Sequence, residues 1–244
     1  QISVLSALQQ KLIRIVCVGD GLHSELRGKE RWLTAFEDFK AGNTAGKAMC
    51  SEMGEGLSLM SLVMECKCRF CENFHFLKGN HENIENRDDG NDYSFYKFVQ
   101  EGLMTRRFIT DYYGEDILYL YACFEHDLPL ASVFPDCIVS HAEPEKAYTY
   151  EQMRDCWTEE NVVFGLSWTA NGSAKEGSVQ TMLDSFTKDP QSAVYFSGHR
   201  TISGKYAYRQ NKKLIQIHNP DAENITLVYS DRQFNPESDI VSVI

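Results

Sequence analysis

Apolar residues follow two patterns along this chain of 244 residues. Short, almost continuous apolar runs predict buried β-strands, the first of them covered on both faces. Apolar residues that recur every three or four positions, with charges between them, predict amphipathic helices. The strands are expected at 12–18, 74–78, 136–140, 193–197, 206–209, 213–217 and 225–229. The helices are expected at 29–40, 57–65, 93–103, 115–125, 150–156 and 179–186.

Strands and helices alternate early in the chain, and strands dominate its end. This order predicts an α/β protein whose sheets carry helices on their outer faces. The last three strands are joined by short turns and are expected to form a meander. The glycine-rich stretch 41–56 is expected to be irregular. No linker divides the sequence, so we expect one domain, 1–244.

Composition narrows the functions that such a fold can serve. The net charge of −11 repels a phosphate backbone and argues against general nucleic-acid binding. The sequence has no run of 18 or more apolar residues, so no membrane-spanning helix is expected. Residues 1–8 are neither basic nor apolar enough for a signal peptide. The chain does not begin with Met, which leaves open that it is trimmed and that a leader was removed.

The sequence contains eight cysteines, and their redox state bears on where in the cell the protein resides. Several lie inside apolar patterns, where a thiol behaves as a small hydrophobic group, so we expect reduced cysteines and a cytoplasmic protein. Cys66, Cys68 and Cys71 form the one cluster. It predicts either a helix end that happens to carry thiols or a structural zinc site completed by Cys50 or His75. The spacing is not that of a zinc ribbon, which favours the first interpretation.

Polar side chains of the kind that bind metals follow the ends of the predicted strands. They are Asp20, His23, Asn80, His81, His141, His199 and His218. Ligands of α/β sheets bind beyond the carboxyl ends of the strands, so we expect these side chains to converge. Imidazole, carboxylate and amide oxygen together suit Mn, Fe or Zn. The two remaining histidines, His75 and His126, are expected to be structural.

The order of these residues resembles the motifs of calcineurin-like metallophosphoesterases. The matching segments are 18–23, 76–82, 139–142 and 197–199. Their spacing is most similar to the branch of serine/threonine protein phosphatases and diadenosine tetraphosphatases. The resemblance spans roughly residues 12 to 230. It implies a four-layer α-β-β-α sandwich of two mixed sheets flanked by helices.

The resemblance also implies a hydrolase that cleaves a phosphate ester with one or two divalent transition-metal ions, Mn, Fe or Zn. Asp20 and His23 would bind the first ion. Asn80, His141 and His199 would bind the second. A metal-activated hydroxide would then attack the phosphorus atom.

The same resemblance assigns roles around the substrate. His81 would be the general acid that protonates the leaving group. Lys78, Arg200 and His218 flank the motifs and are candidates for binding the phosphate. The substrate class implied is a phosphoprotein, a nucleotide or another phosphorylated small molecule.

The first motif departs from the family pattern by one residue. Gly21 and Leu22 both stand between Asp20 and His23, where the family has a single residue. A loop can absorb such an insertion, and Glu25 is a nearby substitute ligand.

The second motif departs further. The family's Gly-Asp-x-x-Asp-Arg-Gly block aligns with about residues 48–54. This puts Met49 in place of the metal-bridging Asp and Met53 in place of a phosphate-binding Arg. Glu52 takes the place of the carboxylate that orients His81. A register shifted by a residue or two would make Glu52 a direct metal ligand, and Asp38 is a remoter candidate. A thioether cannot replace a bridging carboxylate for hard divalent ions, so the activity is in doubt.

Three hypotheses follow from these observations. The favoured one is a metal-dependent phosphoesterase. The alternative is a catalytically impaired protein of the same fold that binds a phosphate compound or a protein partner. The third is a structural zinc protein built on the cysteine cluster.

Overall fold

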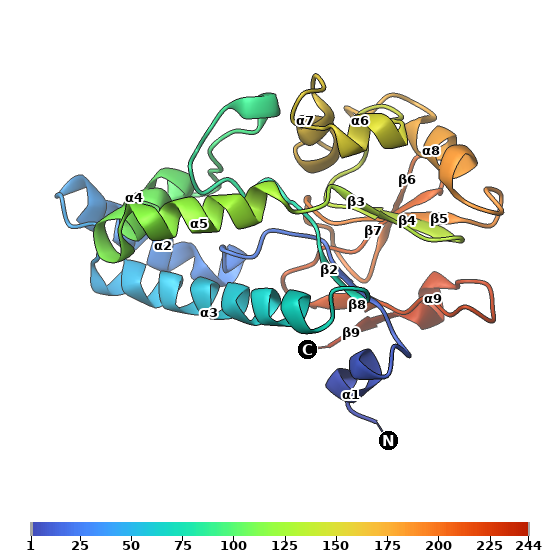
Figure 1. Cartoon of the computed structure of the whole chain (residues 1–244), viewed down its shortest axis with the longest axis horizontal. Helices are drawn as coiled ribbons and strands as arrows, with labels where there is room; N and C mark the ends of the chain where they lie inside the picture. The colour runs from blue at the N-terminus through green and yellow to red at the C-terminus, as the bar shows by residue number, and fades with distance from the viewer. Residues whose placement is uncertain (1, 244) are drawn as a thin grey trace. The chain divides into compact units, whose positions relative to one another are not determined.

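The computed structural model describes residues 2–243 and is a mixed α/β structure (Figure 1). It forms two compact units that divide between Pro129 and Leu130. The first unit is mainly helical, and the second is built on a five-stranded sheet. The α/β class is thereby confirmed. The single domain expected from the sequence stays a prediction.

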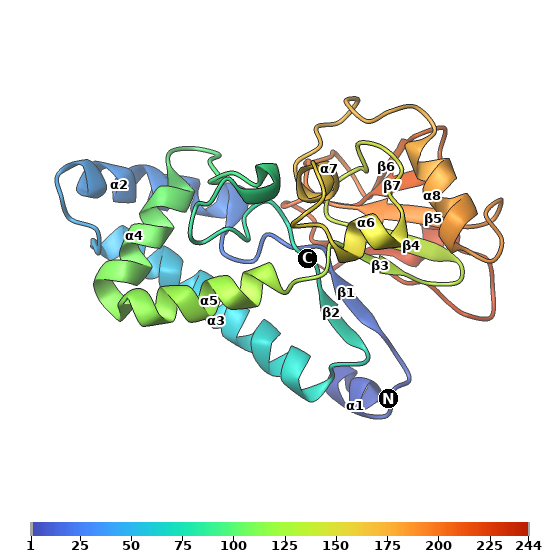
Figure 2. The same ribbon diagram turned by 45° about the horizontal axis from the view of Figure 1, so that its top comes forward.

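The first unit contains two strands and five α-helices among its described residues. In chain order its elements are α1 (Val4–Gln9), β1 (Ile15–Cys17), the 3-10 helix η1 (Glu25–Gly28), α2 (Lys29–Lys40), α3 (Lys47–Arg69), β2 (Phe74–Phe76), the 3-10 helix η2 (Asp89–Asn91), α4 (Glu101–Tyr113) and α5 (Glu115–His126). Figure 2 shows β1 and β2 side by side. They pair in parallel, with Ile15 opposite Phe74 and Cys17 opposite Phe76.

The core of the first unit is organised by α3. Its buried apolar residues recur at intervals of three and four, so they share one face of the helix. They include Met49, Met53, Met60 and Val63. This face packs in one cluster with Trp32 of α2 and with the aromatic side chains of β2. Burial of this face, rather than helix propensity alone, stabilises the helix.

The second unit is a mixed sheet flanked by helices. Its elements are β3 (Ala131–Val133), β4 (Cys137–Ser140), α6 (Tyr150–Arg154), α7 (Val162–Ser167), α8 (Ser178–Phe186), β5 (Val194–Ser197), β6 (Ala207–Arg209), β7 (Leu214–Gln216), β8 (Asn224–Thr226), α9 (Pro236–Asp239) and β9 (Ile240–Ser242). The strand order is β3-β4-β5-β7-β6. The three central strands are parallel, and both edge strands are antiparallel.

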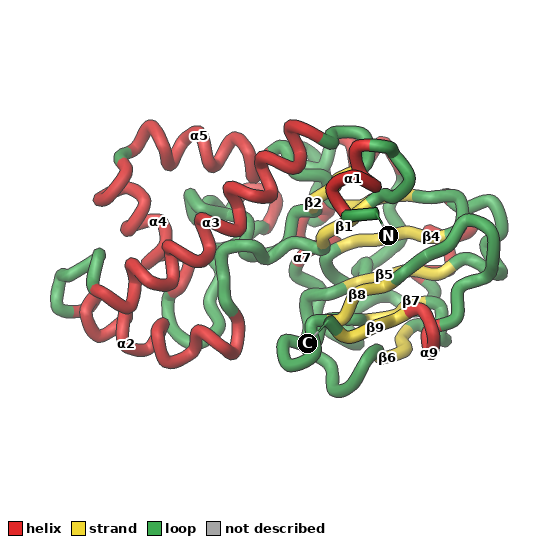
Figure 3. Tube along the Cα trace, turned by 90° about the horizontal axis from the view of Figure 1, so that it is seen from below, coloured by secondary structure: helices red, strands yellow, loops and turns green. Residues whose placement is uncertain are grey.

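The two faces of this sheet are covered differently. Leu166 of α7 and Met182 of α8 pack with Ile138 and Tyr195 of the central strands. Figure 3 shows the separate β8–β9 pair across the opposite face of the sheet. The predicted meander is confirmed for its first two strands, because β6 and β7 pair antiparallel, and it is wrong for the third, because β8 pairs with β9.

Three further expectations are corrected in the first unit. The stretch 47–56 is helical and not irregular, because Met49 and Met53 bury their side chains in the core as part of α3. The helix expected at 93–103 begins only at Glu101. The Glu101 carboxylate accepts the backbone N–H groups of Lys97 and Phe98, which turns the chain just before the helix. The first strand is half-buried, since it is an edge strand of a two-stranded sheet.

Candidate functional site

The turns after β1 and β2 are pressed against each other. Gly19 has a φ of 97°, and a Cβ atom there would lie 2.6 Å from the Gly79 nitrogen. Only glycine combines that backbone angle with such a close approach. Asp20 follows with a φ of 64°, a left-handed conformation that Asp adopts more readily than most residues. The two glycines therefore bring the Asp20 turn against the turn that carries Asn80 and His81.

Glu82 joins these two turns through its carboxylate. Its oxygens accept the backbone N–H groups of Asp20 at 2.9 Å, Gly21 at 2.7 Å and Gly79 at 2.7 Å. The side chain is buried, and three N–H donors satisfy a negative charge that would otherwise be costly to bury. Sequence reasoning gave Glu82 no role, although it completes the most specific motif.

Asp20 and His81 lie together in the first unit. The backbone N–H of His81 donates to Asp20 Oδ1 at 3.1 Å, and His81 Nε2 lies 3.7 Å from Asp20 Oδ2. The His81 ring stacks on Phe95 with 4.4 Å between ring centroids. Asn80 is buried beside them. Three of the predicted site residues are thus brought to one turn.

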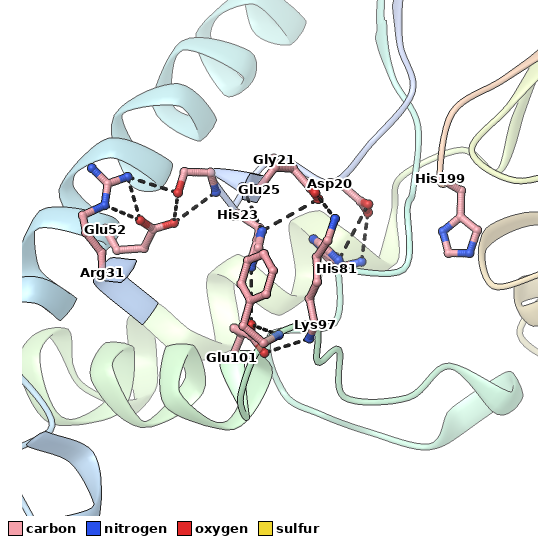
Figure 4. A network of polar contacts seen from close by, with 12 residues as sticks. Asp20, Gly21, His23, Glu25, Arg31, Glu52, His81, Lys97, Glu101 and His199 are labelled. Atoms are coloured by element: carbon pink, nitrogen blue, oxygen red, sulfur yellow. Dashed lines mark hydrogen bonds and ion pairs between the residues drawn. The ribbon is translucent and has the colours of Figure 1, made fainter. Parts of the chain in front are cut away.

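The His23 ring lies beside the His81 ring, with 5.1 Å between the ring centroids (Figure 4). The His23 side chain is fully buried and stacks on Trp32 with 5.3 Å between ring centroids. Leu22, the residue before His23, is buried in the core of the same unit. The ligand atoms of His23 group with those of Glu25 and His81, all within 4.8 Å of one another.

Glu101 closes the pocket around His23. Its Oε1 atom lies 3.6 Å from His23 Nε2, and its side chain is fully buried. Burial raises the pKa of Glu101, but the neighbouring His23 and the backbone N–H groups of Lys97 and Phe98 outweigh it and lower the pKa to about 2. The pocket therefore holds a buried carboxylate charge.

Glu52 does not contact His81, contrary to the orienting role expected for it. Its carboxylate accepts Ser24 N at 3.0 Å, Ser24 Oγ at 2.5 Å and Arg31 Nε at 2.8 Å (Figure 4). The reason is that residues 48–54 form part of α3 instead of a loop. Met49 is only 2% exposed in the core of the helical unit. A carboxylate that does lie beside His81 is that of Asp20.

Lys78 is also directed inward. Its side chain is 2% exposed and forms an ion pair of 2.8 Å with Asp92. Its ammonium group donates to the backbone carbonyl of Glu82. A lysine in this position supports the Glu82 turn, and it is not positioned to bind phosphate.

The second unit brings His141 and His199 together. They follow the adjacent parallel strands β4 and β5, in which Ser140 lies opposite Ser197. The backbone N–H of Gly198 donates to the His141 carbonyl at 2.9 Å. His141 Nε2 and His199 Nδ1 are 3.1 Å apart, so one ring donates a hydrogen bond to the other.

The two remaining predicted residues of this unit are Arg200 and His218. Arg200 follows His199 and is exposed. His218 is half-buried, and its carbonyl accepts the backbone N–H of Ile202 at 2.9 Å. Both side chains are accessible to solvent, as binding of an anion would require.

The cysteine cluster does not converge on a common point. Cys66 is buried in the α3 core, whereas Cys68 and Cys71 are exposed. Within residues 2–243, the sets of three ligand atoms within 4.8 Å include none of these thiols. The structural zinc hypothesis therefore has no geometric support.

Comparisons with known proteins give a likeness in structure. The sequence matches no protein-family model and no curated protein. The structure is similar to that of a protein serine/threonine phosphatase from Saccharomyces cerevisiae with similarity to the human phosphatase PP5, with a TM-score of 0.51. The two sequences are 16% identical, and the match covers 93% of this chain and 77% of the other. The likeness shows a phosphatase-type fold. Among residues 2–243, no helix is long and apolar enough to span a membrane.

Proposed function

We propose that this protein is a divalent-metal-dependent phosphoesterase. One observation carries the proposal. In a chain with a phosphatase-type fold, side chains of metal-ligating types follow shortly after four strands, in the order of the family motifs. They are Asp20, Asn80, His81, His141 and His199. The proposal includes the four-layer sandwich, a cytoplasmic location and a phosphoprotein or nucleotide-type substrate.

The residues present fit a divalent ion. Two imidazole nitrogens bound to one ion at about 2.1 Å each are separated by roughly 3.0–3.4 Å, depending on the angle between the bonds. His141 and His199 offer nitrogens 3.1 Å apart, so an ion can replace the proton between them. In the first unit, Asp20 and Asn80 offer oxygen atoms of the kind that Mn or Fe prefers.

The chain's own residues have distinct tasks in this proposal. A bound ion supplies positive charge to the phosphate oxygens and lowers the pKa of the attacking water. His81 donates a proton to the leaving oxygen, and Asp20, 3.7 Å away, orients the His81 ring. Arg200 is exposed beside His199 and binds the phosphate, with His218 as a second contact.

Hydrolysis of p-nitrophenyl phosphate in Mn²⁺ tests this function. We expect a chelator to abolish the activity and the double variant Asn80→Ala/His141→Ala to lower it by more than about 100-fold. The matched control is His126→Ala, which removes an exposed histidine at the end of α5 and should leave the rate unchanged. Equal rates in the wild type and the double variant would contradict the proposal.

A second candidate function is binding without catalysis. It is favoured by the position of Met49 in the helical core and by the engagement of Glu52 with Ser24 and Arg31, because neither side chain supplies a bridging carboxylate. This function predicts no bound transition metal after expression in Mn-supplemented medium. Two equivalents of metal by elemental analysis would exclude it.

A further inference from the structure

A second set of metal-binding side chains lies inside the first unit. His23, Glu25 and His81 each offer one ligand atom, and these atoms lie within 4.8 Å of one another (Figure 4). The His23 side chain is 0% exposed and that of His81 is 6% exposed, whereas Glu25 is 15% exposed. The group is therefore enclosed on the histidine side and open to solvent on the Glu25 side.

One nitrogen of His23 is poised for a ligand. Its Nδ1 accepts the backbone N–H of Glu25 at 3.0 Å. Its Nε2 is buried, and the Glu101 carboxylate faces it from just beyond hydrogen-bond distance. Buried polar atoms usually have a closer partner, so this nitrogen can accept a further ligand. Glu101 Oε1, 3.6 Å from this nitrogen, adds negative charge that favours a cation there.

A positively charged side chain already pairs with Glu25 of this group. The ammonium group of Lys97 forms an ion pair with Glu25, and the Lys97 side chain is 32% exposed. Lys97 can therefore swing into solvent and vacate the carboxylate. Two imidazoles and one carboxylate form a ligand set that Zn²⁺ takes in proteins, with a further position left open.

We propose that His23, Glu25 and His81 form a zinc-type site that competes with the general-acid role of His81. The regulatory part of this inference rests on the proposed phosphoesterase function, because an ion on the His81 lone pair prevents that ring from carrying the proton. Micromolar Zn²⁺ would then inhibit the Mn²⁺-supported reaction. The metal site itself is independent of any activity.

Cobalt binding tests the site directly. Co²⁺ is titrated into the full chain carrying His141→Ala and His199→Ala, so that the histidine pair of the second unit is removed. We expect one equivalent of Co²⁺ with the visible absorption of a four- or five-coordinate ion, displaced by Zn²⁺. His23→Ala and Glu25→Gln should each weaken binding by at least about tenfold.

Two matched variants sharpen the test. Lys97→Gln should bind Co²⁺ more tightly, because it removes the competing ammonium group from Glu25. His126→Ala should bind with the parent affinity, because that histidine lies exposed at the end of α5. Unchanged Co²⁺ affinity in both His23→Ala and Glu25→Gln would overturn the site. Glu25→Gln keeps the test decisive if His23→Ala fails to fold.

Measurements of hydrolysis distinguish the proposed metal site from the proposed phosphoesterase function. Zn²⁺ should inhibit p-nitrophenyl phosphate hydrolysis by the otherwise wild-type chain. In Glu25→Gln, the inhibition should be relieved relative to that variant's own zinc-free rate. Co²⁺ binding without any hydrolysis would keep the site and reject the phosphoesterase. Hydrolysis by the wild type, together with unchanged Co²⁺ affinity in His23→Ala and Glu25→Gln, would keep the phosphoesterase and reject the metal site.

Discussion

The two compact units hold their candidate residues by different means. In the second unit, backbone pairing places them: β4 and β5 are parallel with Ser140 opposite Ser197, and the histidines follow within two residues. In the first unit, β1 and β2 pair over only three residues. Beyond that pairing, carboxylate side chains fix the loops, above all Glu82, Glu52 and Glu101.

This difference shows how each unit responds to sequence change. A strand register is shared among several backbone hydrogen bonds, so a single side chain hardly alters it. A loop fixed by one carboxylate depends on that residue and on the exact length of the loop. The segment from Asp20 to His23 illustrates the point, because its two ends contact different partners: Asp20 lies near His81, and His23 stacks on Trp32.

The largest expected effect comes from placing a carboxylate at position 49. Met49→Asp should not create a metal ligand. It should bury an unpaired charge in the α3 core and destabilise the first unit by more than about 4 kcal/mol. The measurement is the urea midpoint followed through the fluorescence of Trp32, in a background where the other two tryptophans are replaced by Phe.

Met49→Leu is the control for this prediction. It keeps the volume and polarity of the site, so it should cost less than about 1.5 kcal/mol. An Asp variant that is as stable as the Leu variant and binds additional Mn²⁺ would show that position 49 faces the metal site after all.

A smaller effect is expected at the contact between the two strand-end turns. A Cβ atom on Gly79 would lie 2.3 Å from Asp20 Oδ1 and 2.9 Å from the Asp20 nitrogen. Gly79→Ala should therefore push the turns apart, destabilise the first unit by about 1–3 kcal/mol and weaken Mn²⁺ binding. Calorimetric titration with Mn²⁺ measures the second effect.

Gly79→Ala is compared with a variant of the second unit. Ser140→Ala removes the 2.8 Å hydrogen bond from the Tyr195 hydroxyl, at a similar cost of about 1–3 kcal/mol. Because the β4–β5 ladder remains, Mn²⁺ affinity should be unchanged. Equal losses of affinity in Ser140→Ala and Gly79→Ala would remove the distinction between the two units.

The smallest effect concerns acid stability of the second unit. Arg232 forms two hydrogen bonds with Asp239, at 2.6 and 2.7 Å, and holds the pKa of that carboxyl well below its usual value. A lowered pKa stabilises the fold above the usual value, and this contribution is lost as the pH falls through the lowered pKa. Asp239→Asn should therefore lower the urea midpoint at neutral pH, and the difference from wild type should shrink at about pH 3. A constant difference across this range would contradict the assignment.

The sequence predicted those parts of the structure that depend on local patterns. The helix 29–40 has the predicted bounds, and the strands near 74–76, 137–140 and 194–197 lie where apolar runs indicated. His141 and His199 come together because adjacent parallel strands end together. Such placement follows from short segments and their order.

The features that the sequence did not predict depend on contacts between segments that are far apart in the chain. Nothing near His23 in the sequence indicated that Trp32 and Glu101 would enclose it. The start of α3 was missed because glycines in 41–56 obscured the buried face that Met49 and Met53 begin. Lys78 lies beside the motif in sequence, yet its partner Asp92 draws it into the interior.

The carboxylate of Glu82 has a consequence for solvent access to the backbone. The amides of Asp20, Gly21 and Gly79 lie outside regular secondary structure, where amide hydrogens usually exchange with deuterium quickly. All three donate to one buried side chain, so they become exposed only when the two turns separate. Their exchange should therefore be slow and should accelerate together in Glu82→Gln, which makes these three amides a direct reporter of how often this part of the site opens.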